Sequence, residues 1–159
     1  MDFQTKTEYM SWENAHLRPI YALALTSTGS HAFTVSEDHD IKMWNINEKR
    51  LEDTWPQGHK AAIMCVAVSK SGKYLFTGAQ DGLLNHWSIS ERSVIKSHNH
   101  RDNDECWIIC CAVDNSDSFV FTGTNTGKMM QWSINDEELV HNFGEIIIVF
   151  LQSLNLVCN

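Results

Sequence analysis

Short apolar runs separated by turn-forming residues recur along this chain. In its middle, "IMCVAVS" (63–69) is apolar at nearly every position, and "YLFTGA" (74–79) and "LLNHWSI" (83–89) follow it. The "SKSGK" between the first two runs has hairpin turn chemistry, and the Gly82 of "QDG" can adopt a positive φ. A more polar run, "RSVIKSH" (92–98), completes the set. The pattern predicts four short antiparallel strands within about 40 residues.

The same unit occurs three times. Trp44, Trp87 and Trp132 follow one another at intervals of 43 and 45 residues, and the sequence around them aligns without gaps. "KRLEDTW" and "EELVHNF" stand where the fourth strand is expected in the other two units. A small sheet with two apolar faces cannot stand alone, so the copies must stack on one another. The aligned segments are residues 20–46, 63–89 and 108–134.

This period, strand order and set of polar residues resemble the WD40 repeat, whose four-stranded blades surround a channel as a β-propeller. The resemblance covers Ala15 to about Phe143. It implies an all-β fold, an arc of about three four-stranded antiparallel blades that is not a closed ring, because closure takes roughly 4–8 blades. The expected division is an N-terminal segment that could add a stray outer strand (1–14), three repeats (15–57, 58–98 and a degenerate 99–143) and an apolar tail (144–159).

Four polar residues of the second unit are expected to form one hydrogen-bonded chain. The resemblance implies that the indole N–H of Trp87 binds the hydroxyl of Thr77, the hydroxyl binds His59, and His59 binds Asp81. Buried polar groups need partners, so a satisfied network would lock the outer strands of a blade to its inner strands. The first unit supplies the same set as His16, Thr34, Asp38 and Trp44.

The third unit departs from this pattern. It keeps Thr122 and Trp132, but Thr126 stands where the aspartate should be. Asp104 falls at the position of the histidine, and the two histidines of "HNH" (98–100) lie earlier. We therefore expect the third blade to lack the full network.

Two kinds of chemistry compete with this structural interpretation. A His-Thr-Asp set can imitate a hydrolytic triad, but three near-copies tied to a tryptophan, none beside a serine in a nucleophile elbow, do not predict an active site. A cluster of histidines and cysteines raises a zinc alternative, although its spacing lacks a paired C-x-x-C or H-x-x-x-H. We expect no catalytic residue, no cofactor and no metal site, and keep a zinc-binding or hydrolytic protein as a minor alternative. The cluster is His98, His100, Cys106, Cys110 and Cys111.

The resemblance also places a partner-binding surface on the narrow top face of the arc. Trp107, beside the adaptable Met64 and Tyr21, is the kind of aromatic residue that anchors an interface. The alternative, that Trp107 fills a gap beside an atypical blade, stays open. The positions carried over are Pro19, Tyr21, Glu37, Ala62, Met64, Gln80, Trp107, Ile109 and Asn125.

Charge and cysteine content narrow the partners and the compartment. Twelve basic against twenty acidic residues give a net charge of −8 without a basic block, which argues against nucleic acid. The apolar run at 146–151 is too short for a bilayer, which takes about 20 residues, so no membrane partner is expected. The N-terminus lacks the features of a secretory signal. An odd number of cysteines, five, indicates reduced thiols in the cytoplasm, with the nucleus as the alternative.

The sequence therefore predicts a non-enzymatic scaffold whose partners are other proteins. The alternative is a truncated or partial propeller whose main partner is another copy or chain that completes the ring. An open arc leaves an unpaired edge and an uncovered blade face, so self-association is expected, with Ile146 to Leu151 as the most adhesive segment.

Overall fold

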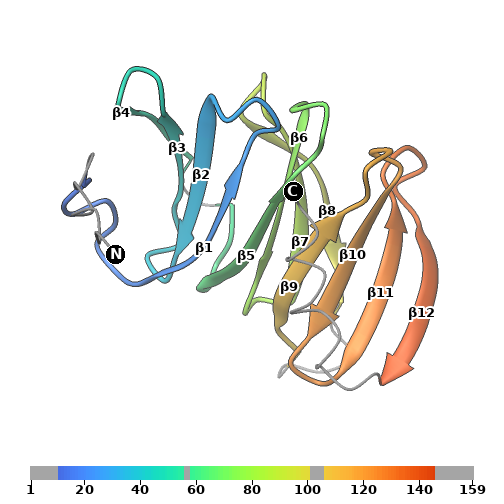
Figure 1. Cartoon of the computed structure of the whole chain (residues 1–159). Coiled ribbons are helices and arrows are strands. Elements are labelled where there is room, and N and C mark those ends of the chain that lie inside the picture. The colour runs from blue at the N-terminus through green and yellow to red at the C-terminus, as the bar shows by residue number, and fades with distance from the viewer. Residues whose placement is uncertain (1–10, 56–57, 101–105, 146–159) are drawn as a thin grey trace, which may run out of the picture.

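Three four-stranded sheets stand side by side in the computed structural model of the chain (Figure 1). The structure describes residues 11–55, 58–100 and 106–145; the predicted adhesive segment at 146–151 lies outside them. In this part of the chain all regular structure is strand, and no helix could cross a membrane.

Each sheet is built from four strands consecutive in the sequence and paired antiparallel in chain order. We call each sheet a blade. The first blade consists of β1 (Ile20–Leu25), β2 (His31–Ser36), β3 (Ile41–Asn45) and β4 (Arg50–Trp55). The second consists of β5 (Ile63–Val68), β6 (Tyr74–Ala79), β7 (Leu83–Ser88) and β8 (Ser93–Asn99). The third consists of β9 (Ile108–Val113), β10 (Phe119–Thr124), β11 (Lys128–Ser133) and β12 (Leu139–Glu145).

The repeat prediction is confirmed down to the turns. Gly82, between β6 and β7, has a φ of 72°, and the equivalent residues His39 and Gly127 have φ values of 70° and 82°. A left-handed residue at this point closes the tight turn that the spacing predicts. The proposed repeat boundaries at 57/58 and 98/99 stay a prediction.

Apolar faces of neighbouring blades pack together. Phe33 and Ile41 of the first blade form one fully buried cluster with Ile63 and Leu75 of the second. On the opposite face of the second blade, Phe76 lies in a second cluster with residues of the third blade. Because side chains of a strand alternate between faces, the middle blade is apolar on both sides and is buried on both.

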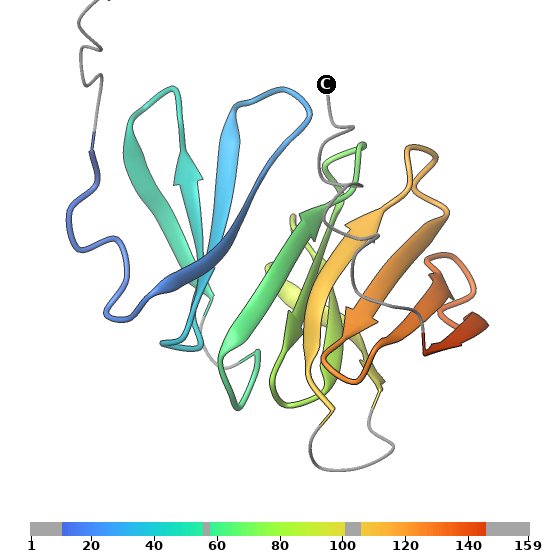
Figure 2. The same cartoon turned by 60° about the horizontal axis from the view of Figure 1, so that its bottom comes forward.

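The arc is open at its first blade, as the sequence predicts (Figure 2). Ala22 and Ala24 of β1 face the second blade, whereas Leu23 and Leu25, on the other face of the strand, are 64% and 56% exposed. The chain thus presents on the surface a blade face of the kind that it buries between its own blades.

The contact between the second and third blades predicts a strict size limit at Gly78. A Cβ atom added there would lie 2.4 Å from Ile108 Cγ2 and 2.7 Å from Cys65 Sγ. We expect Gly78→Ala to lower the free energy of unfolding by about 1–3 kcal/mol through overpacking. Urea unfolding followed by tryptophan emission measures this, with the exposed Ser93→Ala as a control near zero. Equal midpoints for the two variants would contradict the close approach of these blades.

Candidate functional site

The second blade contains the complete hydrogen-bonded chain. Trp87 Nε1 donates to Thr77 Oγ1 at 2.9 Å, and Thr77 Oγ1 lies 2.8 Å from His59 Nε2. His59 Nδ1 is 3.1 Å from both carboxylate oxygens of Asp81. All four side chains are buried, so the network supplies hydrogen-bond partners to polar groups that water does not reach.

The order of donors and acceptors follows from the two ends of this chain. An ionised Asp81 only accepts, so His59 Nδ1 carries the proton that it donates. In the neutral ring His59 Nε2 then accepts from the Thr77 hydroxyl, whose oxygen accepts from Trp87. Each donor along the chain has a matching acceptor, and the Thr77 hydroxyl, fully buried and bonded on both sides, joins β6 to β7 and to the loop before β5.

The aspartate is held in its charged form. Burial alone raises the pKa of Asp81, but the His59 imidazole and the backbone amides of Lys60 and Leu83 outweigh it and bring the pKa below its ordinary value. The two amides donate to the carboxylate at 2.9 and 3.1 Å. Asp81 therefore ties the loop before β5 to the turn after β6.

The first blade repeats this geometry. Trp44 Nε1 donates to Thr34 Oγ1 at 2.8 Å, His16 Nε2 lies 2.8 Å from the same hydroxyl, and His16 Nδ1 is 2.9 Å from Asp38. Burial opposes ionisation of Asp38 too, yet the amides of Leu17 and Asp40, together with His16, lower its pKa.

The third blade obtains its imidazole from a residue outside the aligned position. His100 Nε2 lies 2.7 Å from Thr122 Oγ1 and accepts from Trp132 Nε1 at 3.0 Å. His100 precedes its threonine by 22 residues, against 18 in the other blades, so four more residues intervene. The displacement expected from the sequence thus does not remove the histidine, although no carboxylate among residues 58–100 and 106–145 takes the place of Asp81 beside it. His100 Nδ1 lies 3.3 Å from the carbonyl oxygen of His98, which takes the place of the carboxylate as acceptor.

The complete network of the second blade should matter more for stability than the position that departs from it in the third. We expect Asp81→Ala to lower the free energy of unfolding by about 1–3 kcal/mol, because three donors lose their acceptor. Thr126→Ala, at the equivalent position, is exposed and should cost less than about 0.5 kcal/mol. Urea midpoints compare the two directly. Equal shifts would contradict a stabilising role for the network.

Three histidines are buried where the second and third blades meet. Burial lowers the pKa of His86 and of His100 to about 4 each, and it also lowers the pKa of His98. The ring of His86 stacks on Phe76 with centroids 4.5 Å apart, and its Nε2 has no hydrogen-bond partner within the described residues. A second proton on this ring would therefore place a charged imidazolium in the interface, with an N–H group that has no acceptor.

Stability should consequently depend on pH in the weakly acidic range. Since the folded pKa of His86 lies below the unfolded value of about 6.5, the unfolded chain takes up protons first as pH falls. The contribution of the neutral His86 ring to the free energy of unfolding is therefore fully present above about pH 6.5 and is lost as pH falls towards 4. Urea midpoints between pH 7 and pH 4 should decline, and His86→Phe should flatten the decline. An unchanged slope in His86→Phe would refute the assignment to this ring.

The cysteines of the described residues behave as core thiols. Cys65, Cys106, Cys110 and Cys111 are all free. Burial, assisted by Cys111, raises the pKa of Cys65 well above its ordinary value, and burial raises that of Cys110 to about 11. Thiols held protonated in this way are poor nucleophiles and poor metal ligands. Among the described residues no group of three His, Cys, Asp or Glu side chains is placed to hold a metal ion.

The predicted partner-binding positions gather at one end of the sheets, where the inner strands begin and the second strands end. In each blade a backbone amide after the second strand donates to the carbonyl before the inner strand: Glu37 to Pro19, Gln80 to Ala62 and Asn125 to Trp107, at 3.0–3.1 Å. The inner strands all carry a β-bulge here. The unpaired bulge residues are Tyr21, Met64 and Ile109. A bulge turns a side chain out of the ladder, so the sequence positions share one local geometry.

Exposure separates these positions. Tyr21 and Trp107 are 44% and 39% exposed, whereas Ala62 is buried at 6% and cannot offer its side chain to a partner. Asn125 Oδ1 accepts from the backbone amide of Trp107 at 2.7 Å, which fixes the loop that carries the tryptophan.

Stacked four-stranded blades with repeated networks define a repeat protein of the β-propeller class. The sequence model of the family described as "WD domain, G-beta repeat" matches residues 8–45 and 50–88. The chain belongs to the WD40 repeat family.

Solved structures with the same architecture include "Structure of U3-55K" and "Crystal structure of RRP9 WD40 repeats". Both are 22% identical to this chain, with TM-scores of 0.74 and 0.73. Each alignment covers 80% of this chain and 39% of the other, so the chain spans well under half the length of these proteins. A search of curated proteins gave no significant match.

Proposed function

We propose that the protein is a non-enzymatic scaffold that binds other proteins through the top face of its arc. The carrying observation is the row of three equivalent β-bulges, which places Tyr21, Met64 and Ile109 at the same end of the sheets, beside the exposed Trp107. Large aromatic side chains on a rigid support lose little entropy on binding and are frequent interface anchors. Glu37, Gln80 and Asn125 add polar groups around them. The free cysteines of the described residues, of which Cys65 and Cys106 are buried, favour a reducing compartment, the cytoplasm or the nucleus.

Trp107→Ala and Tyr21→Ala should weaken partner capture at least fivefold without changing the fold, as expected for exposed anchors. The measurement is quantitative capture of lysate proteins on the immobilised chain, with circular dichroism as the folding control. Ile95→Ala, on the outer strand β8, is a matched control because Ile95 is 42% exposed. If Ile95→Ala lowers the amount of captured protein as much as Trp107→Ala does, the top-face assignment is refuted.

A second function is favoured by the exposed apolar face of β1. Leu23 and Leu25 lie on a blade surface that the other blades bury against a neighbour, so ring completion by another copy or chain is the alternative role. This role concerns the ends of the arc, and top-face binding does not depend on it.

A further inference from the structure

An aromatic contact between consecutive blades repeats along the arc. Trp55, at the end of the outer strand β4, packs on Trp87 of the second blade with ring centroids 5.8 Å apart. His98, 43 residues later on β8, packs on Trp132 of the third blade at 4.7 Å. Both covering rings are buried, at 3% and 5% exposure. The first and second blades thus each cover the network tryptophan of the next blade with a ring near the end of the outer strand.

The two ends of the described arc each hold one half of this contact. Phe143 on β12 stands 45 residues after His98, where β12 shifts register against β11, and is 40% exposed. At the other end, Trp44 of the first blade is covered by Trp12, whose ring lies 5.3 Å away but remains 38% exposed. Trp44 itself is 5% exposed, against 3% for Trp87, so the difference lies in the covering ring: Trp12 is accessible to solvent whereas Trp55 is buried.

The inner strands show the same division. Val66 and Val68 of β5 pack into the cluster between the first two blades. The residues 43 positions earlier, Leu23 and Leu25, are exposed. We call Leu23, Leu25 and Trp44 the head face, and Phe143 with His141 the tail edge.

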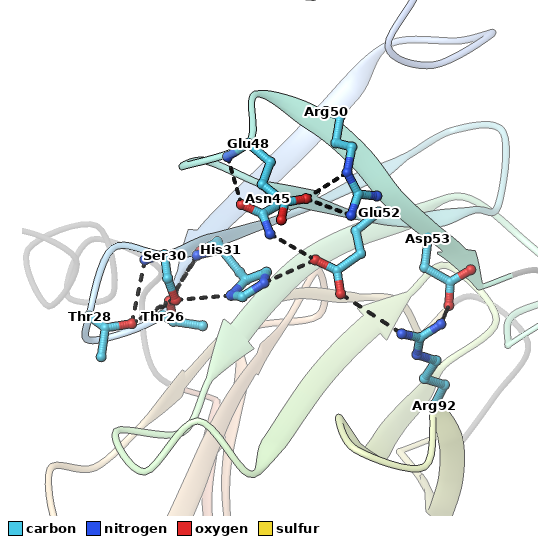
Figure 3. Close-up of polar contacts among 10 residues, drawn as sticks. All are labelled: Thr26, Thr28, Ser30, His31, Asn45, Glu48, Arg50, Glu52, Asp53 and Arg92. Atoms are coloured by element: carbon cyan, nitrogen blue, oxygen red, sulfur yellow. Dashed lines mark hydrogen bonds and ion pairs between the residues drawn. The ribbon is translucent and has the colours of Figure 1, made fainter.

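Opposite charges join consecutive blades at their outer strands. Arg92, in the turn between β7 and β8, reaches back to the first blade, with Nη1 2.8 Å from Asp53 Oδ2 and Nη2 3.8 Å from Glu52 Oε1 (Figure 3). Glu137, in the equivalent turn of the third blade, pairs with Lys96 of the second at 3.4 Å. Arg92 and Glu137 have φ values of 56° and 55°, so the turns place the two side chains alike.

The corresponding positions at the ends of the arc are Lys49 and His141. Lys49 has a φ of 57° in the turn between β3 and β4, and His141 stands on β12 45 residues after Lys96. Both are exposed. A histidine facing a lysine forms no ion pair, so an end-to-end contact would resemble the internal interfaces in its apolar part and lack their charge pair.

We propose that two copies of this chain associate head to tail, with the tail edge of each copy on the head face of the other. Phe143 of one copy then displaces Trp12 and covers Trp44 of the second copy, while Leu23 and Leu25 become buried. Two identical contacts join two arcs of three blades into six, a number within the roughly 4–8 blades of closed propellers. The inference rests on ring completion, the second proposed function, and is independent of the top face.

Light scattering over a concentration series of the purified chain should show a monomer–dimer equilibrium. Phe143→Ala and the double variant Leu23→Asp/Leu25→Asp should each remain monomeric with unchanged circular dichroism, because all these side chains are exposed in the single chain. A mixture of the two variants should associate again, since one intact head face and one intact tail edge remain. Trp12→Ala should raise the dimer fraction by removing the competing ring.

A charge substitution provides a second test, in which the dimer is expected to become more stable. His141→Asp recreates the carboxylate that Asp53 offers to Arg92, now opposite Lys49 of the second copy. The dimer should become about tenfold tighter, because two ion pairs of ordinary surface strength form, and high salt should remove the gain. Lys49→Asp in the same chain should cancel it.

A dimer that persists in both Phe143→Ala and the leucine variant would overturn the head-to-tail arrangement. So would a chain that stays monomeric at all concentrations and also as His141→Asp. Neither result would contradict ring completion by a different protein. That role is refuted if the Leu23→Asp/Leu25→Asp variant captures the same proteins from lysate as the unchanged chain.

Discussion

The burial of one blade face against the next is the constraint on which the rest of this structure depends. A four-stranded sheet with two apolar faces is unstable in water, so each blade needs a neighbour on both sides. Only the middle blade has both neighbours among the described residues, and its Leu75 and Phe76 are fully buried on opposite faces. The exposed face of β1 follows directly from the same arrangement, and with it the expectation of association.

Within each blade the polar network adds what apolar packing cannot, a fixed relation between a loop and the two middle strands. Asp81 and Asp38 stay ionised because several N–H groups donate to each, and each histidine is thereby held in one tautomer. In the third blade His100 stands 22 residues before its threonine, against 18 in the second blade, and its Nδ1 lies 3.3 Å from the carbonyl oxygen of His98.

The two proposed surfaces lie on different parts of the arc. Three bulges place Tyr21, Met64 and Ile109 at one narrow end of the sheets. The exposed face of β1 lies instead at the open side of the first blade. The proposed protein binding and the proposed association are therefore compatible in one molecule, because the two surfaces share none of their side chains.

The sequence by itself determined the strands, the turns, the three-blade arc and two of the three networks, because each depends on spacing within one repeat of constant length. Trp12 and Trp55 also lie 43 residues apart in the sequence, but only the structure shows that each of them packs on a network tryptophan. The contacts between side chains of different blades were decided by the tertiary structure alone. His100 was not predicted, because alignment fixes a position and loop length decides which side chain reaches it. The pairing of Arg92 with Asp53 and the burial of Ala62 arise from the stacking of separate sheets, which local pattern does not encode.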